Sequence, residues 1–338
     1  MTLAPAVSFD LGSFRYATHA ADVTVTLGLL PAVNSAVVRL PADVPVDAAP
    51  GDDAEIRLKC EGDEVTVLKG TLRSIRRHFD HTTAICGDAG VLLAAVRPAA
   101  TYERQSVADI IRALGGEAGI ADFDLNVNLR LTSFSAHQGR TSAQHVATLA
   151  ELSGAIAYVL GDGVLKVVPR PEEPDTALRY GREFIEYNVT ESVAPSQRVT
   201  VGFGPAGSTD APDALKHTVT GLPEDAPAGG PGVLREAIAV LRTPSAAKDA
   251  SEARSKASSA NATRFYARCF LQPALRPGMV VEVQDLPEGL NGGAWLLDRV
   301  RHTIASDRAG VTVLSGSIAA PPDGGLFGAI AGAIGALL

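Results

Sequence analysis

The sequence has little of what marks several large classes of protein. Aromatic residues make up 5% of its 338 residues, acidic residues outnumber basic ones, and the formal net charge is −8. Because sequence-independent binding of DNA or RNA relies on Lys and Arg that neutralise phosphates, this balance argues against a nucleic-acid-binding protein. The three cysteines form no CxxC pair and no even-numbered framework. We therefore expect reduced thiols in a protein made in the cytoplasm.

Targeting and membrane signals are also missing. The N-terminal run MTLAPAVSFDLG has no basic region followed by an apolar one, so we expect no signal peptide. No run reaches the roughly 18–20 apolar residues that a spanning helix needs. The last residues, GLFGAIAGAIGALL (325–338), carry no polar side chain, but as a helix they would extend only about 21 Å. Their likeness to a viral fusion peptide covers eight common small or apolar letters, and we interpret it as coincidence.

The usual marks of catalysis, phosphate binding and metal ligation are absent too. The sequence has no HExxH, no GxSxG and no glycine-rich loop that ends in Lys-Ser/Thr. The tightest group of metal-capable side chains, at 78–81, is better interpreted as a polar turn that ends a strand. We expect His302 to form hydrogen bonds in a core or interface and Trp295 to fill a core. We therefore predict no enzyme, no catalytic residue, no cofactor and no metal.

What is present in the first part of the chain is strand-like. Between residues 1 and 98, short runs with partial apolar alternation are separated by turn-forming clusters such as PADVPVDAAPGDD. Many short strands at this spacing are typical of a small barrel or sandwich. We predict a first β-barrel domain over 1–98.

The period changes to that of helices between residues 99 and 170. Ser106 with Asp109, and Thr141 with Gln144, have the spacing of capping boxes, and an apolar stripe follows each. Two strand-like runs joined through Gly-Asp-Gly then predict a hairpin. We expect an α/β domain with two helices over 99–170.

Strand character returns over 171–210 and 264–320, which we predict to form a second β-barrel domain. Residues 211–263 form an insertion: a Pro/Gly-rich loop, then a helix opened by Thr243 and Pro244. That helix has almost no large apolar residue, so it is either exposed or packed through its alanines. The fold class is a β-dominated α+β fold, and the two β units suggest a diverged internal duplication. An apolar tail, 321–338, ends the chain.

The order of these features resembles a known family. The run VLKGTLRSIRRHFDHTTAICGDAGVLL resembles the strands that end the first barrel of phage tail hub proteins. HVATLAELSGAIAYVLGDGVLKVV is similar to their helix and hairpin, and RPGMVVEV with GAWLLDRVRHTI is similar to their closing strands. From about residue 20 to 318 the sequence resembles the late control protein D family of contractile phages, whose relatives are the N-terminal hub parts of VgrG spikes.

The resemblance implies a structural baseplate hub. Such a hub is a homotrimer in which two barrels per subunit make a pseudo-sixfold ring that joins the sixfold tail tube to a threefold spike. The implied partners are the tail tube protein, a separate spike protein, a tape-measure protein, a LysM-like adaptor and baseplate wedge proteins. We expect a virion tail baseplate or an injection particle assembled in the cytoplasm, with no specific nucleic-acid binding and no stable membrane insertion. A lumen that carried the net negative charge would let DNA or protein cargo pass.

The tail supplies the candidate interface residues. On a helical wheel its large side chains fall on one arc and its glycines on the opposite one, which allows close packing of three tails or docking to an axial partner. The predicted contact residues are Leu326, Phe327, Gly328, Ile330, Gly332, Ile334, Leu337 and Leu338. Two alternatives stay open: a membrane-active protein that uses this tail, and a cell-wall hydrolase whose site has no recognisable motif.

Overall fold

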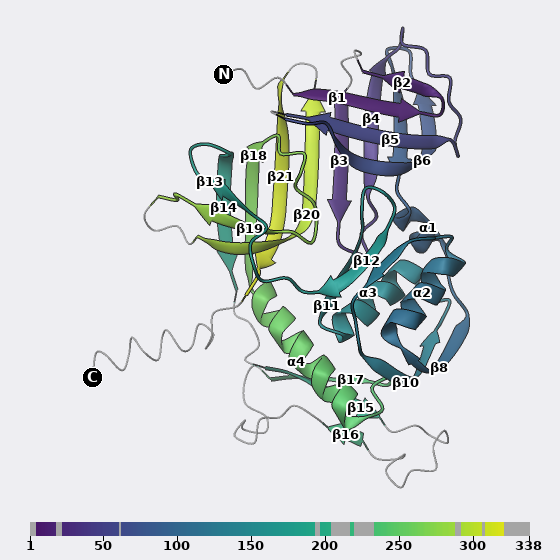
Figure 1. Cartoon of the computed structure of the whole chain (residues 1–338), viewed down its shortest axis with the longest axis vertical. Coiled ribbons are helices and arrows are strands. Elements are labelled where there is room, and N and C mark those ends of the chain that lie inside the picture. Colours follow the sequence, from purple (N-terminus) through teal and green to yellow (C-terminus); the bar gives the residue numbers. More distant parts are fainter. Residues whose placement is uncertain are drawn as a thin grey trace.

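The computed structural model describes residues 5–17, 22–60, 62–192, 197–203, 217–219, 233–287, 292–305 and 308–320. Two groups of strands lie side by side at one end of the molecule, and most of the helical structure lies toward the other end (Figure 1). The fold is therefore strand-dominated with a helical part, which confirms the predicted β-dominated α+β class.

The first β unit holds every strand-like run expected between residues 20 and 88. Its strands are β1 (Ala6–Leu11), β2 (Phe14–Tyr16), β3 (Asp22–Gly28), β4 (Ser35–Pro41), β5 (Asp53–Lys59), β6 (Val65–Arg77) and β7 (His81–Gly87). Alternate residues point into one core, as with Val23, Val25 and Leu27 of β3. β1 and β2 were not predicted, because the N-terminal run shows only a short alternation.

The α/β unit forms beside the first β unit. Its elements are α1 (Gly90–Ala95), β8 (Ala100–Ser106), α2 (Val107–Glu117), β9 (Phe123–Leu125), β10 (Arg130–Ala136), α3 (Ser142–Leu152), β11 (Ala155–Val159) and β12 (Leu165–Pro169). Both predicted caps are present: Ser106 Oγ accepts from the Asp109 backbone N–H, and Thr141 and Gln144 form a complete capping box. α1 was not predicted, since it is short and has no side-chain cap.

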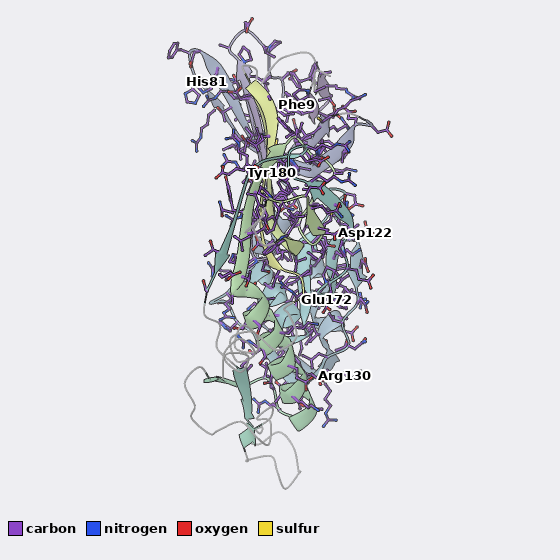
Figure 2. All side chains as sticks on the ribbon, turned by 90° about the vertical axis from the view of Figure 1, so that its left-hand side faces the viewer. Phe9, His81, Asp122, Arg130, Glu172 and Tyr180 are labelled. Atoms are coloured by element: carbon purple, nitrogen blue, oxygen red, sulfur yellow. The ribbon has the colours of Figure 1, made fainter. Side chains whose placement is uncertain are left out.

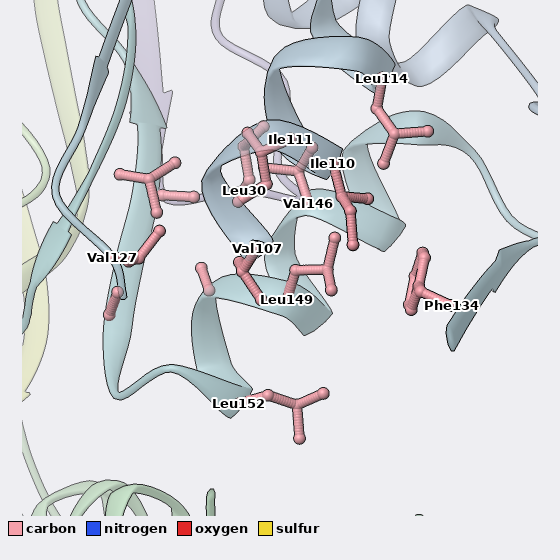
Figure 3. Close-up of a cluster of buried hydrophobic side chains, with 14 of the residues drawn as sticks. Leu30, Val107, Ile110, Ile111, Leu114, Val127, Phe134, Val146, Leu149 and Leu152 are labelled. Atoms are coloured by element: carbon pink, nitrogen blue, oxygen red, sulfur yellow. The ribbon is translucent and has the colours of Figure 1, made fainter. Parts of the chain in front are cut away.

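The two longer helices of this unit are held by an apolar core. Ile110, Ile111 and Leu114 of α2 face Val146 and Leu149 of α3, and all five side chains are fully buried (Figure 3). β11 and β12 pair antiparallel as the predicted hairpin. The N-caps at Ser106 and Thr141 fix where the helices begin, and this core fixes how they pack.

A buried polar network fastens the α/β unit to the first β unit. The Asn34 Nδ2 donates to Asp88 Oδ2 at 2.7 Å and to the Val159 carbonyl at 3.2 Å. The Gly90 N–H donates to Asp88 Oδ1 at 2.9 Å, and the Gly28 N–H donates to Asn34 Oδ1 at 2.8 Å. Burial raises the pKa of the Asp88 carboxyl to about 7, although these hydrogen bonds oppose the rise.

The second β unit comprises β13 (Thr176–Arg179), β14 (Phe184–Glu191), β18 (Thr263–Phe270), β19 (Val280–Gln284), β20 (Gly293–Ala305) and β21 (Arg308–Ile318). Trp295 is 1% exposed and packs against Phe265, with 5.0 Å between ring centroids, so the prediction that it fills a core is confirmed. The turn before β19 has Gly278 at φ +86°, the conformation that the Pro-Gly pair predicts.

The insertion contains more strand than expected. β15 (Gln197–Phe203), β16 (His217–Val219) and β17 (Val233–Ile238) form a three-stranded sheet of their own. Residues 197–203, which the sequence assigned to the second β unit, therefore pair within the insertion, and part of the expected loop is a strand. These partners lie far apart in sequence, so no local pattern indicates the pairing.

The polar helix packs through its alanines. α4 (Pro244–Asn261) opens at Thr243, whose Oγ1 accepts from the Ala246 N–H, as predicted. Ala246, Ala247 and Ala250 are buried, and α4 contacts α3. Small side chains let the helix approach closely where Gly154 faces Ala253. Of the two options left open for this helix, packing is the correct one.

The two β units are joined edge to edge. β3 pairs antiparallel with β20, which makes one 13-stranded sheet with the order β14-β18-β21-β20-β3-β4-β7-β6-β5-β1-β2 and with β13 and β19 off this path. Among the described strands, no pairing joins β3 to β1 or β14 to β13, so neither unit closes into the barrel that the sequence suggested. The edge of β3 that could close the first unit is taken by β20.

The strand orders support an internal duplication. Apart from the short β2, which has no counterpart in the second unit, the first unit has in chain order β1, β3, β4, β5, β6 and β7, and the second has β13, β14, β18, β19, β20 and β21. Across the sheet the first unit is ordered β3-β4-β7-β6-β5-β1, and the second β14-β18-β21-β20-β19-β13. The two orders are the same, element for element. They differ in one pairing, since β1 and β5 are antiparallel and β13 and β19 are parallel.

Candidate subunit interface

The eight tail residues predicted to contact a partner, Leu326, Phe327, Gly328, Ile330, Gly332, Ile334, Leu337 and Leu338, lie outside the described residues. Within the described residues, the two β units carry the candidate interface. None of the helices in the described part of the chain is long and apolar enough to cross a bilayer.

The polar cluster at 78–81 is the turn between β6 and β7, as predicted. The His78 and His81 rings stack at 4.2 Å, and His81 Nδ1 lies 2.7 Å from Asp80 Oδ1. The hydrogen bond from His81 holds the pKa of the Asp80 carboxyl below its usual value. Within the described residues, no group of three or more His, Cys, Asp or Glu side chains could hold a metal ion.

The tip of this turn presents Phe79 to solvent. Its side chain is 97% exposed, the highest value among the exposed large apolar residues. Figure 2 shows the neighbouring His81 at the extreme end of the molecule, away from the helices. Phe79 alone does not mark an interface, because apolar side chains exposed singly are common on protein surfaces.

At the junction between the units, the β20–β21 hairpin is covered by β3. At the β20–β3 pairing, Ile304 lies opposite Val23 and His302 opposite Val25. Ile304 is 6% exposed and belongs to the apolar core of the first unit. His302 is fully buried, with Nδ1 3.0 Å from Thr312 Oγ1 and Nε2 3.2 Å from the Leu275 carbonyl, as expected for core hydrogen bonding. Desolvation lowers the pKa of His302 to about 4.

The two hairpins match in register. The β6–β7 pairing shifts between Leu72 and Ser74, and the β20–β21 pairing shifts between Leu297 and Arg299. A bulge of this kind fixes the local register of a hairpin, so superposing the two shifts aligns β6 with β20 residue by residue. The runs LRSIRRH (72–78) and LDRVRHT (297–303) then coincide.

This alignment places Arg77 where His302 stands. The Arg77 Nη2 donates to the Val46 carbonyl at 3.2 Å, as His302 Nε2 meets the Leu275 carbonyl in the second unit. Val46 and Leu275 occupy corresponding positions after the third strand of each unit. Counted on from there, Phe79 corresponds to Ile304, but β6 ends at Arg77 and Phe79 lies in the turn, whereas β20 continues to Ala305. The two hairpins therefore match up to Arg77 and His302, and the hairpin of the second unit extends further.

The matching edge strand is β14, whose outer edge is left unpaired by the described strands. The register of β18 against β21 and of β4 against β7 aligns EYNVT (186–190) of β14 with DVTVT (22–26) of β3. β3 is covered by β20. Among the described strands, β14 pairs only with β18, apart from one bridge between Tyr180 and Phe184. Beyond Leu72, likewise, no described strand pairs with the second edge of β6.

The two uncovered edges are complementary. The β6 edge carries Arg73, Arg76 and Arg77, all exposed, whereas β14 carries Glu186 and Glu191, also exposed. Large apolar side chains stand beside each edge, with Phe79 at one and Ile185, 47% exposed, at the other. These residues were not predicted from the sequence. The signal that could have found them is the similarity of the paired runs, which is too short to recognise before the sheet supplies the register.

Comparisons with known proteins agree with this architecture. No family model matches the chain, and no curated protein matches its sequence. Among solved structures, the chain is similar to a tail protein of prophage MuSo2 from Shewanella oneidensis, with 13% identity over 93% of this chain and 98% of that one and a TM-score of 0.67. A tail protein from Neisseria meningitidis is similar at 15% identity over 93% and 96%, with a TM-score of 0.69.

A component of the Escherichia coli type VI secretion system, itself described as similar to the phage T4 tail proteins gp27 and gp5, matches at 12% identity over 91% of this chain and 76% of that one, with a TM-score of 0.62. Identities this low establish the fold alone. The chain has the fold of phage tail proteins and of this secretion component, so the resemblance seen in the sequence is confirmed for the fold.

Proposed function

We propose that the protein is a structural baseplate hub, a homotrimer whose six β units form a pseudo-sixfold ring that joins a sixfold tail tube to a threefold spike. The observation that carries the proposal is the duplicated unit with one covered junction and one uncovered copy of it. A unit that repeats twice per chain and leaves complementary edges at its two ends forms a head-to-tail contact, which closes into a ring when the rotation allows.

The covered junction specifies how one copy would meet the next. If β6 of one copy pairs with β14 of its neighbour in the register of β20 with β3, Arg77 lies opposite Val189 and Phe79 opposite Tyr187. Phe79, in the turn just beyond β6, is then placed beside Tyr187, where the second β unit of the neighbour can cover it. Burying a phenylalanine contributes roughly 1.5–3 kcal/mol at each contact.

Charge supports the same pairing. In this register Ile75 lies opposite Glu191, and Arg77 lies diagonally across from Glu191 on the same face of the sheet. Diagonal neighbours of opposite charge lie within reach of long side chains and stabilise a strand pair by a few tenths of a kcal/mol. The like-charged alternative, in which two β6 edges met, would place arginines against arginines.

The native mass tests the trimer. Light scattering of the full chain is expected to give three times the 35.0 kDa of one chain. The trimer is expected to form a stable complex with a tail tube protein on one side and a spike protein on the other. A monodisperse monomer of 35.0 kDa that binds neither the tube protein nor the spike protein would overturn the proposal. Clearing of cell wall by the purified protein, or leakage from liposomes, would favour the two alternatives.

The tail is proposed to capture an axial partner. Its six large apolar side chains and its glycines suit packing against the two other tails, a spike or a tape-measure protein. Deleting 325–338 is expected to leave the ring intact and to weaken capture of the axial partner, measured by pull-down. Unchanged capture by the truncated ring would remove the tail from the interface.

A further inference from the structure

One face of the joined sheet carries arginine and no lysine. The strands β14, β18, β21, β20, β3, β4, β7 and the second half of β6 lie side by side. Alternate residues, such as Val25, Val38 and Leu314, are buried on one face, so their neighbours point to the other. The charged residues of that second face are Arg39, Arg76, Arg264, Arg268, Arg299 and Arg301, with Asp22, Glu186 and Asp298.

Two of the arginines in each unit belong to a repeated row. In the first unit the cross-strand register runs from Asp22 to Arg39, then Thr83, then Arg76. Side chains joined by direct register lie on the same face, and the two arginines are two strands apart, about 10 Å. All three charged side chains of the row point away from the core.

The second unit has the same row. Its register runs from Glu186 to Arg268, then Val313, then Arg301. Its charged members stand at equivalent positions in the first unit: Glu186 corresponds to Asp22, Arg268 to Arg39 and Arg301 to Arg76. Residues around them differ between the units, so this row is the charged feature that the two halves share. Arg264, by contrast, pairs with Asp298 and has no charged equivalent in the first unit.

We propose that these rows form an arginine belt that binds the phosphate backbone of double-stranded DNA on the ring axis. The proposal rests on the ring of the preceding section with this face toward its axis. Units related by the pseudo-sixfold rotation place their rows at one height. Two arginines in each of two rows in each of three copies would give twelve guanidinium groups around the axis, beside six carboxylates.

The belt suits a duplex better than an acidic protein segment. A repeated row presents the same pair of guanidinium groups from every direction, and a duplex carries phosphates on every side, one charge per about 1.7 Å of its axis. An acidic segment presents carboxylates in an irregular pattern. Arginine binds phosphate through two parallel hydrogen bonds, and the acid in each row limits the affinity, so the contact is sequence-independent and reversible.

The net charge of the chain does not oppose such a contact. At physiological ionic strength charges farther away than about 8 Å are largely screened, so the local face decides what binds there. The proposed belt predicts a positively charged lumen at this height, where the net charge led us to expect a negatively charged one. It also predicts sequence-independent binding of DNA, against which the net charge argued.

The test is a binding titration on the ring itself. The trimer, with its mass checked by light scattering in the same buffer, is titrated into a labelled duplex of about 30 base pairs while anisotropy is recorded between about 50 and 200 mM salt. We expect binding that weakens with salt. Replacing Arg39, Arg76, Arg268 and Arg301 by Gln is expected to lower the affinity at least about tenfold and to flatten the salt dependence.

A matched variant controls for net charge. Arg97, Arg112, Arg130 and Arg140, all exposed in the α/β unit, are replaced by Gln and are expected to leave binding unchanged. The proposal is overturned if the wild-type trimer does not bind the duplex at low salt, or if the belt variant binds as the wild type does. Tighter binding of a poly-glutamate chain than of the duplex would assign the belt to an acidic protein segment. A sample that is not trimeric would overturn the ring, and the belt with it.

Discussion

The two β units have the same strand order and differ in what covers their hairpins. In the second unit β20 extends to Ala305, and its residue Ile304 is 6% exposed because β3 and the core of the first unit receive it. In the first unit β6 ends at Arg77, and Phe79 in the turn beyond it is 97% exposed. Two residues earlier in each hairpin, His302 is buried and Arg77 is exposed. Two hairpins of the same strand order thus carry different residue types: His302 lies beside the covering strand β3, and Arg77 lies where no described strand covers it.

The buried tip gives the largest expected effect. Replacing Ile304 by Asp places a charge in the core of the first unit without a partner, which we expect to lower the free energy of unfolding by about 3 kcal/mol or more. The matched change Ile304→Val is expected to cost only about 1 kcal/mol. Urea unfolding followed by circular dichroism measures both. A loss below about 1 kcal/mol for Ile304→Asp would show that the units are not joined through this residue.

The exposed tip is expected to respond in assembly. Since Phe79 contacts solvent in the single chain, Phe79→Asp should leave the free energy of unfolding of the dissociated chain within about 0.5 kcal/mol. It should raise the dissociation constant of the trimer at least about tenfold, because the tip then places a charge against Tyr187 of the next copy. Sedimentation velocity over a dilution series measures the constant, with Phe79→Leu as control. An unchanged constant would disconnect this hairpin from assembly.

The first unit is expected to lose stability as pH rises. Burial raises the pKa of Asp88 from 3.8 to about 7, so the unfolded chain releases this proton at lower pH than the folded chain does. The free energy of unfolding should therefore fall as pH rises from about 4 to about 7. The position equivalent to Asp88 in the second unit is Ile318, which cannot titrate. In Asp88→Asn this pH-dependent part should disappear. The variant should also cost roughly 1–3 kcal/mol, because its amide meets that of Asn34.

The second unit is expected to show the opposite sign and the smallest effect. The pKa of His302 is lowered from 6.5 to about 4, so between these pH values the unfolded chain binds a proton that the folded chain does not bind. The free energy of unfolding should fall as pH drops from about 6.5 toward 4. His302→Gln keeps a hydrogen-bonding group and should remove this slope, while the slope from Asp88 remains. Unfolding curves at several pH values separate the two, and a slope that survives His302→Gln would reassign it.

Local features of the fold could be predicted from the sequence. The capping residues Ser106 and Thr141 give two helix starts, and the alternating runs give most strands of the first unit. The pairing of β3 with β20 could not be predicted from the sequence. It joins strands near opposite ends of the chain, and it depends on which strand edge is free. The same holds for β15 with β17. Position along the chain carries little information about such contacts.

The tail residues that the sequence offers as an interface lie outside the described residues, so this interface stays a prediction. The sequence suggested a duplication and a trimer. It also predicted the apolar tail as a contact surface, because hydrophobicity is the strongest local signal. The pairing surfaces of β6 and β14 are charged and short, so they resemble ordinary exposed strands. Only the sheet register shows that Arg77 and His302, or Asp22 and Glu186, stand at equivalent positions.

The most direct test of the account is a cross-link between copies at the predicted register. Arg77 and Val189 of neighbouring copies would lie opposite each other, where antiparallel Cα atoms are about 4.5–5.5 Å apart and a disulfide can form. The variant Arg77→Cys with Val189→Cys, made in a Cys60→Ser background, should give dimer and trimer bands on a non-reducing denaturing gel. Arg77→Cys with Asn188→Cys, whose side chain points to the other face, should give far less. A trimer in solution that forms no more cross-link with the first pair than with the second would contradict the β6–β14 pairing.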